Sequence, residues 1–182
     1  MVRITDTNLM SAFSGECQAH VRYLVYSDIA KDEGFANLSR LFHAVSFSER
    51  IHAYNHFTTL KDVSGDHVTA AISPFAIGKS TENLMSAISG ERFEVAELYP
   101  AFLEVASSQD DSDAYVSLNY AYMSEIEHKK LFERALDTVS TGRDSRTGPV
   151  QVCLKCGYTI EGDAPDMCPI CKAPAIEFKQ FG

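Results

Sequence analysis

The chain has no tryptophan, no long apolar run and no excess of basic residues. A membrane-spanning helix needs roughly 20 consecutive apolar residues, and no stretch of the sequence approaches that length. Acidic residues outnumber basic ones by 25 to 16, which gives a formal net charge of −9. Because a negative field repels phosphate backbones, we expect neither a nucleic-acid partner nor a membrane. The first ten residues lack the pattern of a signal peptide, so a cytoplasmic protein is expected.

Cysteine is also scarce, and its five residues are unevenly placed. Cys17 stands alone near the start. The other four lie in the last 30 residues, at Cys153, Cys156, Cys168 and Cys171. An odd total with one tight cluster favours metal binding over a set of disulfides. With 182 residues, of which 45% are hydrophobic, the rest of the chain can bury a core without cross-links.

The stretch from Ser140 to Pro149 is rich in serine, glycine, arginine and threonine, and it divides the chain. The pattern before it is helical, and the segment after it holds the four clustered cysteines. We therefore predict a helical domain over residues 1–140, a linker over 141–149 and a small metal-binding domain over 150–182.

Apolar residues recur at helical spacing in four long segments. We expect these helices from Asp6 to Gly34, from Ala36 to Val63, from a cap at Ser80 or Thr81 to Ser108, and from Asp111 or Ser112 to a point before Gly142. Pro100 should kink the third helix. Four such helices suit a four-helix bundle. The long connection from Ser64 to Lys79 contains Ile72, Phe75 and Ile77, so we predict a crossover that packs along the bundle.

The helical part repeats itself. Residues 8–16 match residues 83–91 at an offset of 75, with one substitution. A Glu-x-x-His motif follows each copy, at Glu49 and His52 after the first and at Glu125 and His128 after the second. The bundle should therefore consist of two similar helical pairs around an approximate two-fold axis, and a site on that axis would receive matching ligands from both.

Glu-x-x-His on a helix places both side chains on one face. A single motif of this kind usually marks a solvated face, but here both motifs and the repeated Glu16 and Glu91 lie on apolar stripes. A buried carboxylate without a partner is very costly, so these glutamates need a cation. Two inward Glu-x-x-His helices, with one inward glutamate from each of the other two, form the di-iron carboxylate pattern of ferritin-like bundles. The alternative is a polar core that is satisfied by hydrogen bonds alone.

Several neighbours are candidates for supporting roles. Glu94 lies three residues after Glu91, on the same face, and is a candidate extra ligand. Tyr23 and Tyr99 follow Glu16 and Glu91 by about two turns, where each phenol can hydrogen-bond a ligand carboxylate; core packing is the alternative. His56 is expected to be an ordinary polar or surface residue.

The four clustered cysteines form two Cys-x-x-Cys motifs. Gly157 and Ala173, each small, follow the second cysteine of each pair and let the turn close. Four thiolates at this spacing give a tetrahedral site for zinc or for a single iron. The spacing does not separate the two metals. A redox-active dinuclear site on the same chain would need an electron entry point, which favours iron.

Together these motifs resemble the rubrerythrin family over nearly the whole chain. The matching stretches are Gly15-Glu16 with residues 19–23, residues 49–53, residues 90–94 with Tyr99-Pro100, residues 125–128, and the rubredoxin-like cysteine tail. The resemblance implies a ferritin-like four-helix bundle with a long crossover between its second and third helices. It also implies a small C-terminal rubredoxin-like domain built on β-strands and cysteine knuckles.

The resemblance further implies two irons in the bundle and one iron in the tail, with zinc as a possible substitute. By resemblance, Glu49 and Glu125 bridge the irons, Glu16 is terminal on the first iron, and Glu91 and His128 bind the second. The first iron would exchange Glu94 for His52 on reduction. We also expect Glu94, once freed, to relay a proton. Subunits pair as a homodimer so that the tail of one subunit approaches the other subunit's di-iron site.

The activity that the resemblance implies is reduction of hydrogen peroxide to water, an oxidative-stress defence. Electrons would come from a rubredoxin or from an NAD(P)H-dependent flavoprotein reductase, through the tail iron. Two alternatives remain open from the sequence. One is a ferroxidase or iron-handling ferritin-like protein, and the other is an electron-transfer or sensor module with structural zinc in the tail.

Overall fold

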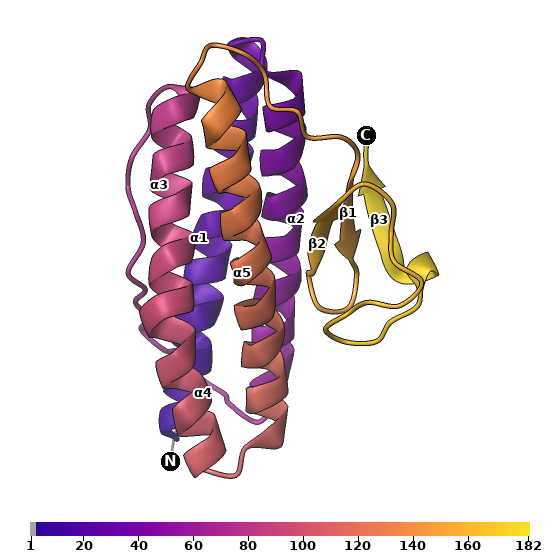
Figure 1. The fold of residues 1–182 in the computed structure, drawn as a ribbon. Helices are drawn as coiled ribbons and strands as arrows, with labels where there is room; N and C mark the ends of the chain where they lie inside the picture. The colour runs from indigo at the N-terminus through magenta and orange to yellow at the C-terminus, as the bar shows by residue number, and fades with distance from the viewer. Residues whose placement is uncertain (1–2) are drawn as a thin grey trace.

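The computed structural model describes residues 3–182 and has a long helical bundle with a small sheet beside it (Figure 1). Residues 1 and 2 belong to the predicted helical domain and N-terminal segment and lie outside the described residues. The helices are α1 (Ile4–Asp32), α2 (Ala36–Thr59), α3 (Ser80–Phe93), α4 (Tyr99–Ser108) and α5 (Ser112–Val139). The predicted mainly helical class and four-helix bundle are confirmed, with α3 and α4 as one interrupted helix. None of the helices within residues 3–182 is both long and apolar enough to cross a membrane.

A π-helical segment, Glu94–Leu98, joins α3 to α4. Pro100 follows it at the start of α4. Because proline has no N–H, it cannot donate the hydrogen bond that a regular helix requires there. The sequence predicts a kink at Pro100. In the structure, the irregularity is a wider π-helical turn in the residues just before this proline. Such turns occur frequently at functional sites, and this one carries Glu94.

Most helix ends follow from local chemistry. Gly34 adopts a left-handed backbone with φ +86° just after α1, and the Asp111 carboxylate accepts a hydrogen bond of 3.1 Å from the Ala114 N–H at the start of α5. The third helix begins at Ser80, as predicted, but neither Ser80 nor Thr81 is its cap. The N-cap of α3 is Lys79, whose N–H donates to Glu82 Oε2 at 2.8 Å.

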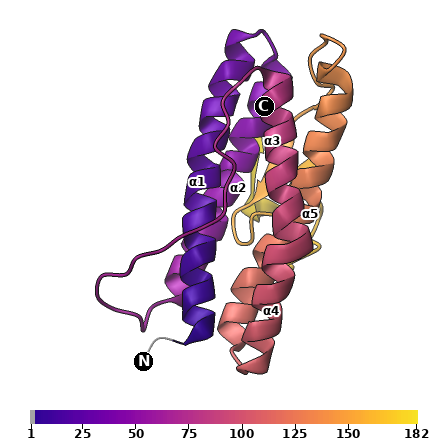
Figure 2. The same cartoon turned by 90° about the vertical axis from the view of Figure 1, so that its left-hand side faces the viewer.

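The crossover between α2 and α3 runs along the outer side of α1 (Figure 2). Polar side chains of α1 hold its backbone: Ser11 Oγ donates to the Ala70 carbonyl at 2.8 Å, and the Tyr26 hydroxyl donates to the Ala76 carbonyl at 2.6 Å. The predicted crossover along the bundle is confirmed, but its apolar side chains do not supply the packing. They are exposed: Ile72 by 77%, Phe75 by 93% and Ile77 by 77%. The hydrogen bonds fix the main chain with these side chains turned outward.

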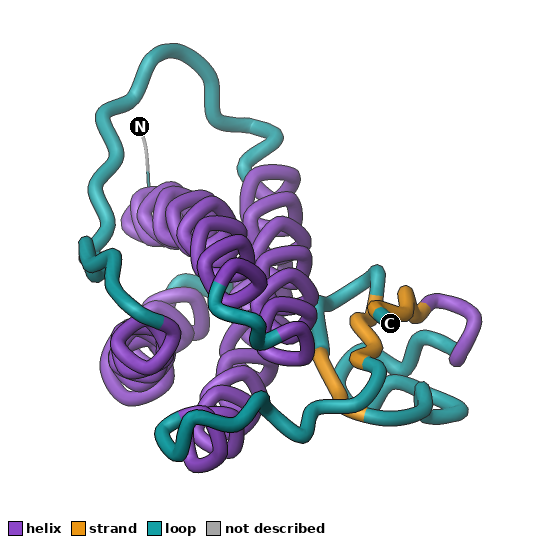
Figure 3. The backbone as a smooth tube through the Cα atoms, turned by 90° about the horizontal axis from the view of Figure 1, so that it is seen from above, coloured by secondary structure: helices purple, strands orange, loops and turns teal. Residues whose placement is uncertain are grey.

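The C-terminal sheet lies on the side of the bundle away from the crossover (Figure 3). It is antiparallel with the strand order β2-β1-β3. The strands are β1 (Val150–Cys153), β2 (Thr159–Glu161) and β3 (Phe178–Phe181), and a 3₁₀ turn, Ala175–Glu177, precedes β3. The sheet packs beside α2 and α5 (Figure 1).

The apolar core of the bundle is divided into two clusters. One contains Tyr23, Phe42 and Phe132 and extends into the sheet. The other contains Leu9, Tyr99 and Leu118, near the N-terminal end of α5. Because the residues at positions 16, 49, 52, 91, 125 and 128 are polar, the interior between these clusters is lined by groups that need partners.

Candidate metal centres

Four glutamates and two histidines meet in the interior of the bundle. Each main helix contributes to the group, and the two Glu-x-x-His motifs place a carboxylate and an imidazole one turn apart on α2 and on α5. The six residues are Glu16 on α1, Glu49 and His52 on α2, Glu91 on α3, and Glu125 and His128 on α5. None is more than 1% exposed. Water therefore cannot stabilise their charges.

The six residues form two overlapping groups of four. In each group, one ligand atom from every member lies within 4.8 Å of the others. The first group is Glu16, Glu49, His52 and Glu125, and the second is Glu49, Glu91, Glu125 and His128. Glu49 and Glu125 belong to both groups. This is the arrangement that a pair of cations with two shared carboxylates requires.

The donor set fits metal ions better than it fits hydrogen bonding. One oxygen of each glutamate is buried without a hydrogen-bond partner among the described residues: Glu16 Oε2, Glu49 Oε1, Glu91 Oε2 and Glu125 Oε1. Unpaired buried carboxylate oxygens are costly. His52 Nδ1 lies 2.9 Å from Glu49 Oε2, and His128 Nδ1 lies 2.7 Å from Glu125 Oε2. Ligands that meet at 90° around one metal at about 2.1 Å lie about 3 Å apart, so these separations suit neighbouring ligands as well as hydrogen bonds.

The outer nitrogens of both histidines face the sheet domain. His128 Nε2 lies 3.0 Å from Thr159 Oγ1, and that hydroxyl donates to the Gly157 carbonyl at 2.9 Å. Its single hydrogen is therefore used, so the hydroxyl accepts from His128 Nε2–H. Ser48 Oγ likewise donates to the Gly157 carbonyl at 2.5 Å and faces His52 Nε2 at 3.4 Å. With its Nε2 facing the sheet domain, each imidazole turns Nδ1 toward the carboxylates, and this nitrogen would bind a metal once any proton on it is displaced.

The pKa values show how strongly the carboxylates repel one another without a cation. Burial, followed by the charge of Glu125, raises the pKa of Glu91 well above its usual range. Burial and the charge of Glu49 do the same for the pKa of Glu125. Burial lowers the pKa of His52, but the negative charge of Glu125 outweighs it and the net shift is upward. The metal-free site therefore retains protons that bound cations would displace.

Tyr23 and Tyr99 hold the carboxylates across the two-fold repeat. Tyr23, on the same helix as Glu16, donates its hydroxyl to Glu91 Oε1 at 2.5 Å. Tyr99, which follows Glu91, donates its hydroxyl to Glu16 Oε1. Each tyrosine therefore supports the glutamate of the other half. Burial, with the charge of the neighbouring carboxylate, raises the pKa of both phenols, so both hydroxyls stay protonated.

The sequence interpretation missed His56. Expected to be an ordinary polar or surface residue, it is fully buried. Its Nδ1 lies 2.9 Å from Ser117 Oγ and its Nε2 lies 3.2 Å from the Tyr99 hydroxyl. One arrangement of protons satisfies this series of hydrogen bonds: Ser117 donates to His56, His56 donates to Tyr99, and Tyr99 donates to Glu16. The signal that could have found it is its position one helical turn after His52.

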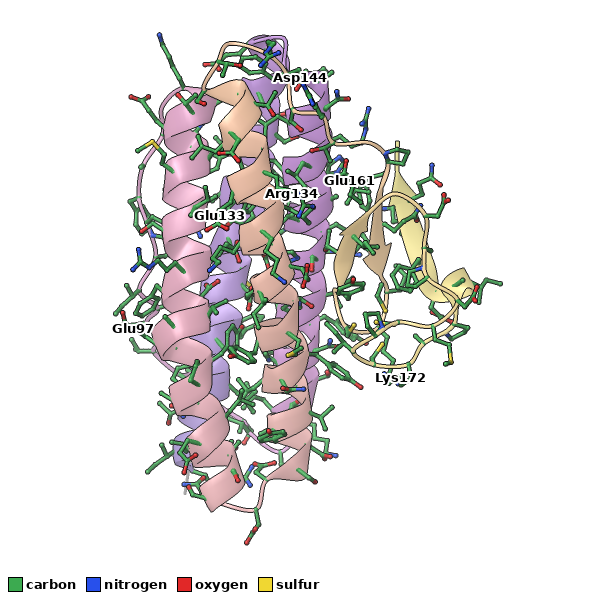
Figure 4. All side chains as sticks on the ribbon, viewed as in Figure 1. Glu97, Glu133, Arg134, Asp144, Glu161 and Lys172 are labelled. Carbon is green, nitrogen blue, oxygen red and sulfur yellow. The ribbon has the colours of Figure 1, made fainter. Side chains whose placement is uncertain are left out.

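Glu94 lies outside both groups of four. It is half-buried on the π-helical segment, and burial with the charge of Glu16 raises its pKa well above the usual range. The structure therefore brings His52, and not Glu94, into the cluster. Glu97 is exposed and projects from the outer side of the bundle, away from the site (Figure 4).

The four C-terminal cysteines come together as a second site, and all four are buried. Cys153 Sγ and Cys171 Sγ lie 3.5 Å apart, as do Cys156 Sγ and Cys168 Sγ. A disulfide would require about 2.05 Å, whereas four thiolates around one metal at about 2.3 Å lie about 3.8 Å apart. A hydrogen bond with Cys156 lowers the pKa of Cys153 to about 5, so one thiolate is available at neutral pH. The set fits a single tetrahedral metal ion. Cys17 lies outside it and is half-buried beside the crossover.

Two family models match the two parts of the chain. The model described as Rubrerythrin matches residues 7–136, and the model described as Rubrerythrin, rubredoxin-like domain, matches residues 151–179. The first contains all six residues of the bundle cluster, and the second contains all four clustered cysteines.

Similar proteins extend the match over nearly the whole length. The chain is 38% identical over 178 residues to Rubrerythrin-2 of Clostridium acetobutylicum, covering 98% of this chain and 97% of that protein. It is 27% identical over 177 residues to Nigerythrin of Nitratidesulfovibrio vulgaris, covering 97% and 86%. Among solved structures, fully reduced, all-ferrous nigerythrin superposes with a TM-score of 0.85 at 26% identity, covering 97% of this chain and 86% of that one.

Proposed function

The chain belongs to the rubrerythrin family, and we propose that it reduces hydrogen peroxide to water at the bundle site, with electrons that arrive through the four-cysteine site. Iron is the metal typical of both sites in this family. The observation that carries the proposal is the pairing of two metal-competent sites in one chain. One is a buried cluster of four carboxylates and two imidazoles, and the other is a four-thiolate site beside it.

We assign the ligands from the two overlapping groups. Glu49 and Glu125, which belong to both groups, would bridge the two irons. Glu16 and His52 would complete the first iron site, and Glu91 and His128 the second. Glu94, on the wider helical turn, would replace His52 on the first iron when the site is oxidised.

When bound, a pair of irons supplies two electrons and polarises both oxygens of a peroxide. The protein's own contribution is orientation, exclusion of water and proton transfer. Tyr23 and Tyr99 donate hydrogen bonds that fix Glu91 and Glu16. The apolar clusters on both sides keep the site dry. Glu94 is half-buried at its edge, where a carboxyl can carry a proton between solvent and substrate.

The proposal includes an external electron donor, either a rubredoxin or an NAD(P)H-dependent flavoprotein reductase. A homodimer and a cytoplasmic location complete it as expectations from the sequence.

A steady-state assay with NADH, a flavoprotein reductase and a rubredoxin tests the proposal. We expect NADH oxidation that depends on peroxide and on the iron-loaded protein. Cys168→Ser, which removes one thiolate of the tail, should abolish donor-driven turnover but leave peroxide consumption by the dithionite-reduced bundle site. Turnover with dioxygen in place of peroxide, together with loading far above three irons per chain, would support the ferroxidase or storage alternative instead.

A further inference from the structure

A polar hollow on the surface of the bundle lies between α2 and α5. Its volume is about 290 Å³, and its lining includes Thr58, Lys61 and Asp113, which are exposed. Water therefore fills it. Ser117 of α5 also lines the hollow but is only 5% exposed, so its side chain lies where the hollow meets the interior of the bundle.

Hydrogen bonds lead from Ser117 inward to the bundle site. Ser117 Oγ lies 2.9 Å from His56 Nδ1, and His56 Nε2 lies 3.2 Å from the Tyr99 hydroxyl. That hydroxyl donates to Glu16 Oε1. His56, Tyr99 and Glu16 are each no more than 1% exposed. The series therefore connects the hollow with a carboxylate that solvent does not reach, and all four residues belong to the bundle.

The other half of the repeat lacks this connection. The second Glu-x-x-His motif begins 76 residues after the first, at position 125 instead of 49. At the same offset, His56 corresponds to Phe132 and Ser117 corresponds to Leu41, and both of these apolar side chains are buried. The Phe132 ring packs edge-on against the Tyr23 ring, with their centroids 5.3 Å apart. Tyr23 thus meets a side chain that cannot pass a proton, whereas Tyr99 meets one that can.

The π-helical segment keeps the two tyrosines at matching places. Tyr99 follows Glu91 by eight residues, whereas Tyr23 follows Glu16 by seven. A π-helical turn is wider than an α-helical one, and the segment Glu94–Leu98 absorbs the additional residue. Each tyrosine consequently reaches the glutamate of the opposite half. The two halves differ in what lies behind the tyrosine, not in the tyrosine itself.

We propose that Ser117, His56 and Tyr99 form a proton relay from water in the hollow to Glu16. This rests on the proposed function, in which one peroxide takes up two electrons and two protons to give two waters. Water gives a proton to Ser117 as Ser117 gives its own to His56 Nδ1. His56 then passes its Nε2 proton to Tyr99, and Tyr99 passes its hydroxyl proton to Glu16. Glu16 gives the proton to a peroxide oxygen, and bulk water reprotonates the hydroxide in the hollow.

The relay complements Glu94, which carries a proton in the proposed function. Glu94 lies on the segment between α3 and α4, whereas the hollow lies between α2 and α5. A reaction that consumes two protons can thus draw them from two places. Histidine suits the middle of the relay, because it accepts a proton at one ring nitrogen and releases another from the second.

Exchange of two buried hydroxyl protons with solvent tests the relay without turnover. Tyr23 and Tyr99 are both buried and both donate to a carboxylate of the bundle site. In the zinc-loaded protein, magnetic resonance should show that the Tyr99 hydroxyl proton exchanges with water about 100-fold faster than that of Tyr23, at the low end of the range for transfer by positioned side chains. Equal exchange rates would overturn the proposal.

Two buried serines provide a matched pair of variants. Ser117→Val removes the hydroxyl at the hollow and fills its place, so water cannot substitute for it. Ser27→Val makes the same change in α1, where Ser27 Oγ donates to the Ser39 carbonyl at 2.8 Å. We expect the Tyr99 proton to exchange as slowly as that of Tyr23 in Ser117→Val and at the wild-type rate in Ser27→Val. An unchanged Tyr99 rate in Ser117→Val would contradict the relay.

His56→Gln separates proton transfer from hydrogen bonding. The amide can accept from Ser117 and donate to Tyr99, but it does not pass a proton on. We expect wild-type metal content, slow Tyr99 exchange, and peroxide consumption by the dithionite-reduced bundle site that is about 100-fold slower. A wild-type rate of both processes, or slow consumption that is explained by lost metal, would overturn the relay. If this variant does not fold, Ser117→Val decides by the same two measurements.

The proposed function and the relay fail in different ways. If the reduced wild-type protein does not consume peroxide, the proposed function is refuted. The exchange rates of the two tyrosine protons in the zinc-loaded protein do not depend on that result, and they still decide whether the hollow and Glu16 exchange protons.

Discussion

At the scale of single residues, the cluster is held by hydroxyl groups from the opposite half of the repeat. The repeat and the Glu-x-x-His spacing predict which glutamates and histidines come together, because one helix turn fixes their common face. They do not predict that Tyr23 reaches Glu91 and Tyr99 reaches Glu16, since this depends on how the two halves pack. His56 escaped prediction for the same reason: its partners come from α4 and α5.

Replacing each tyrosine by phenylalanine measures these bonds. Tyr23→Phe leaves one buried carboxylate oxygen of Glu91 without its donor, at a cost of about 1–3 kcal/mol. Tyr99→Phe should cost more, because it also removes the acceptor of His56. Urea unfolding of the metal-free variants measures both values. An equal loss of stability in the two variants would show that the hydrogen bonds that link Ser117, His56, Tyr99 and Glu16 do not act as one network.

At the scale of secondary-structure elements, hydrophobic periodicity predicts the helices well, because each buries one apolar stripe. It does not locate the π-helical segment at Glu94–Leu98 or the orientation of the crossover. Both depend on contacts with other elements. The crossover turns Ile72, Phe75 and Ile77 outward because hydrogen bonds from α1 fix its backbone. The docking of the sheet on its own bundle is likewise outside the reach of local sequence patterns.

The linker caps α2, because Asp144 Oδ2 accepts from the Asn37 N–H at 2.8 Å and Asp144 Oδ1 accepts from the Leu38 N–H at 3.2 Å. Asp144→Ala should lower the free energy of unfolding by about 0.5–2 kcal/mol, as for the loss of an N-cap, and should loosen the linker. Amide hydrogen exchange should then speed up at Asn37 and Leu38. Asp163→Ala, in an exposed turn of the tail, serves as the control and should change neither. Unchanged exchange in Asp144→Ala would contradict the assigned cap.

At the scale of the whole molecule, stability and metal binding are linked through the buried carboxylates. Glu91 and Glu125 have raised pKa values in the metal-free fold, so the folded state binds more protons than the unfolded state above the ordinary glutamate pKa. His52 is raised too, and its contribution is also lost as pH rises. Glu16, His56 and Cys153 have lowered pKa values and act in the opposite direction. The contribution of Glu16 is already complete above that ordinary value, and the other two are outnumbered by the four groups with raised pKa values, which include Glu94. The metal-free fold therefore loses stability as pH rises.

We expect the melting temperature of the metal-free protein to fall from about pH 5 to about pH 8, since the unfolded carboxyls ionise near 4.3. The iron-loaded protein should change in the opposite direction, because protons compete with the metal for the same oxygens. Calorimetry on both forms across this range measures the difference. A metal-free protein that becomes more stable towards pH 8 would contradict a cluster of mutually repelling carboxylates.

The central claim is that the two metal sites of this chain serve peroxide reduction. Anaerobic stopped-flow mixing of the fully reduced, iron-loaded protein tests it most directly, with the bundle and tail absorbance followed after mixing with peroxide or with dioxygen. We predict rapid oxidation of both sites by peroxide and slow oxidation by dioxygen. Oxidation by dioxygen as fast as by peroxide would contradict it.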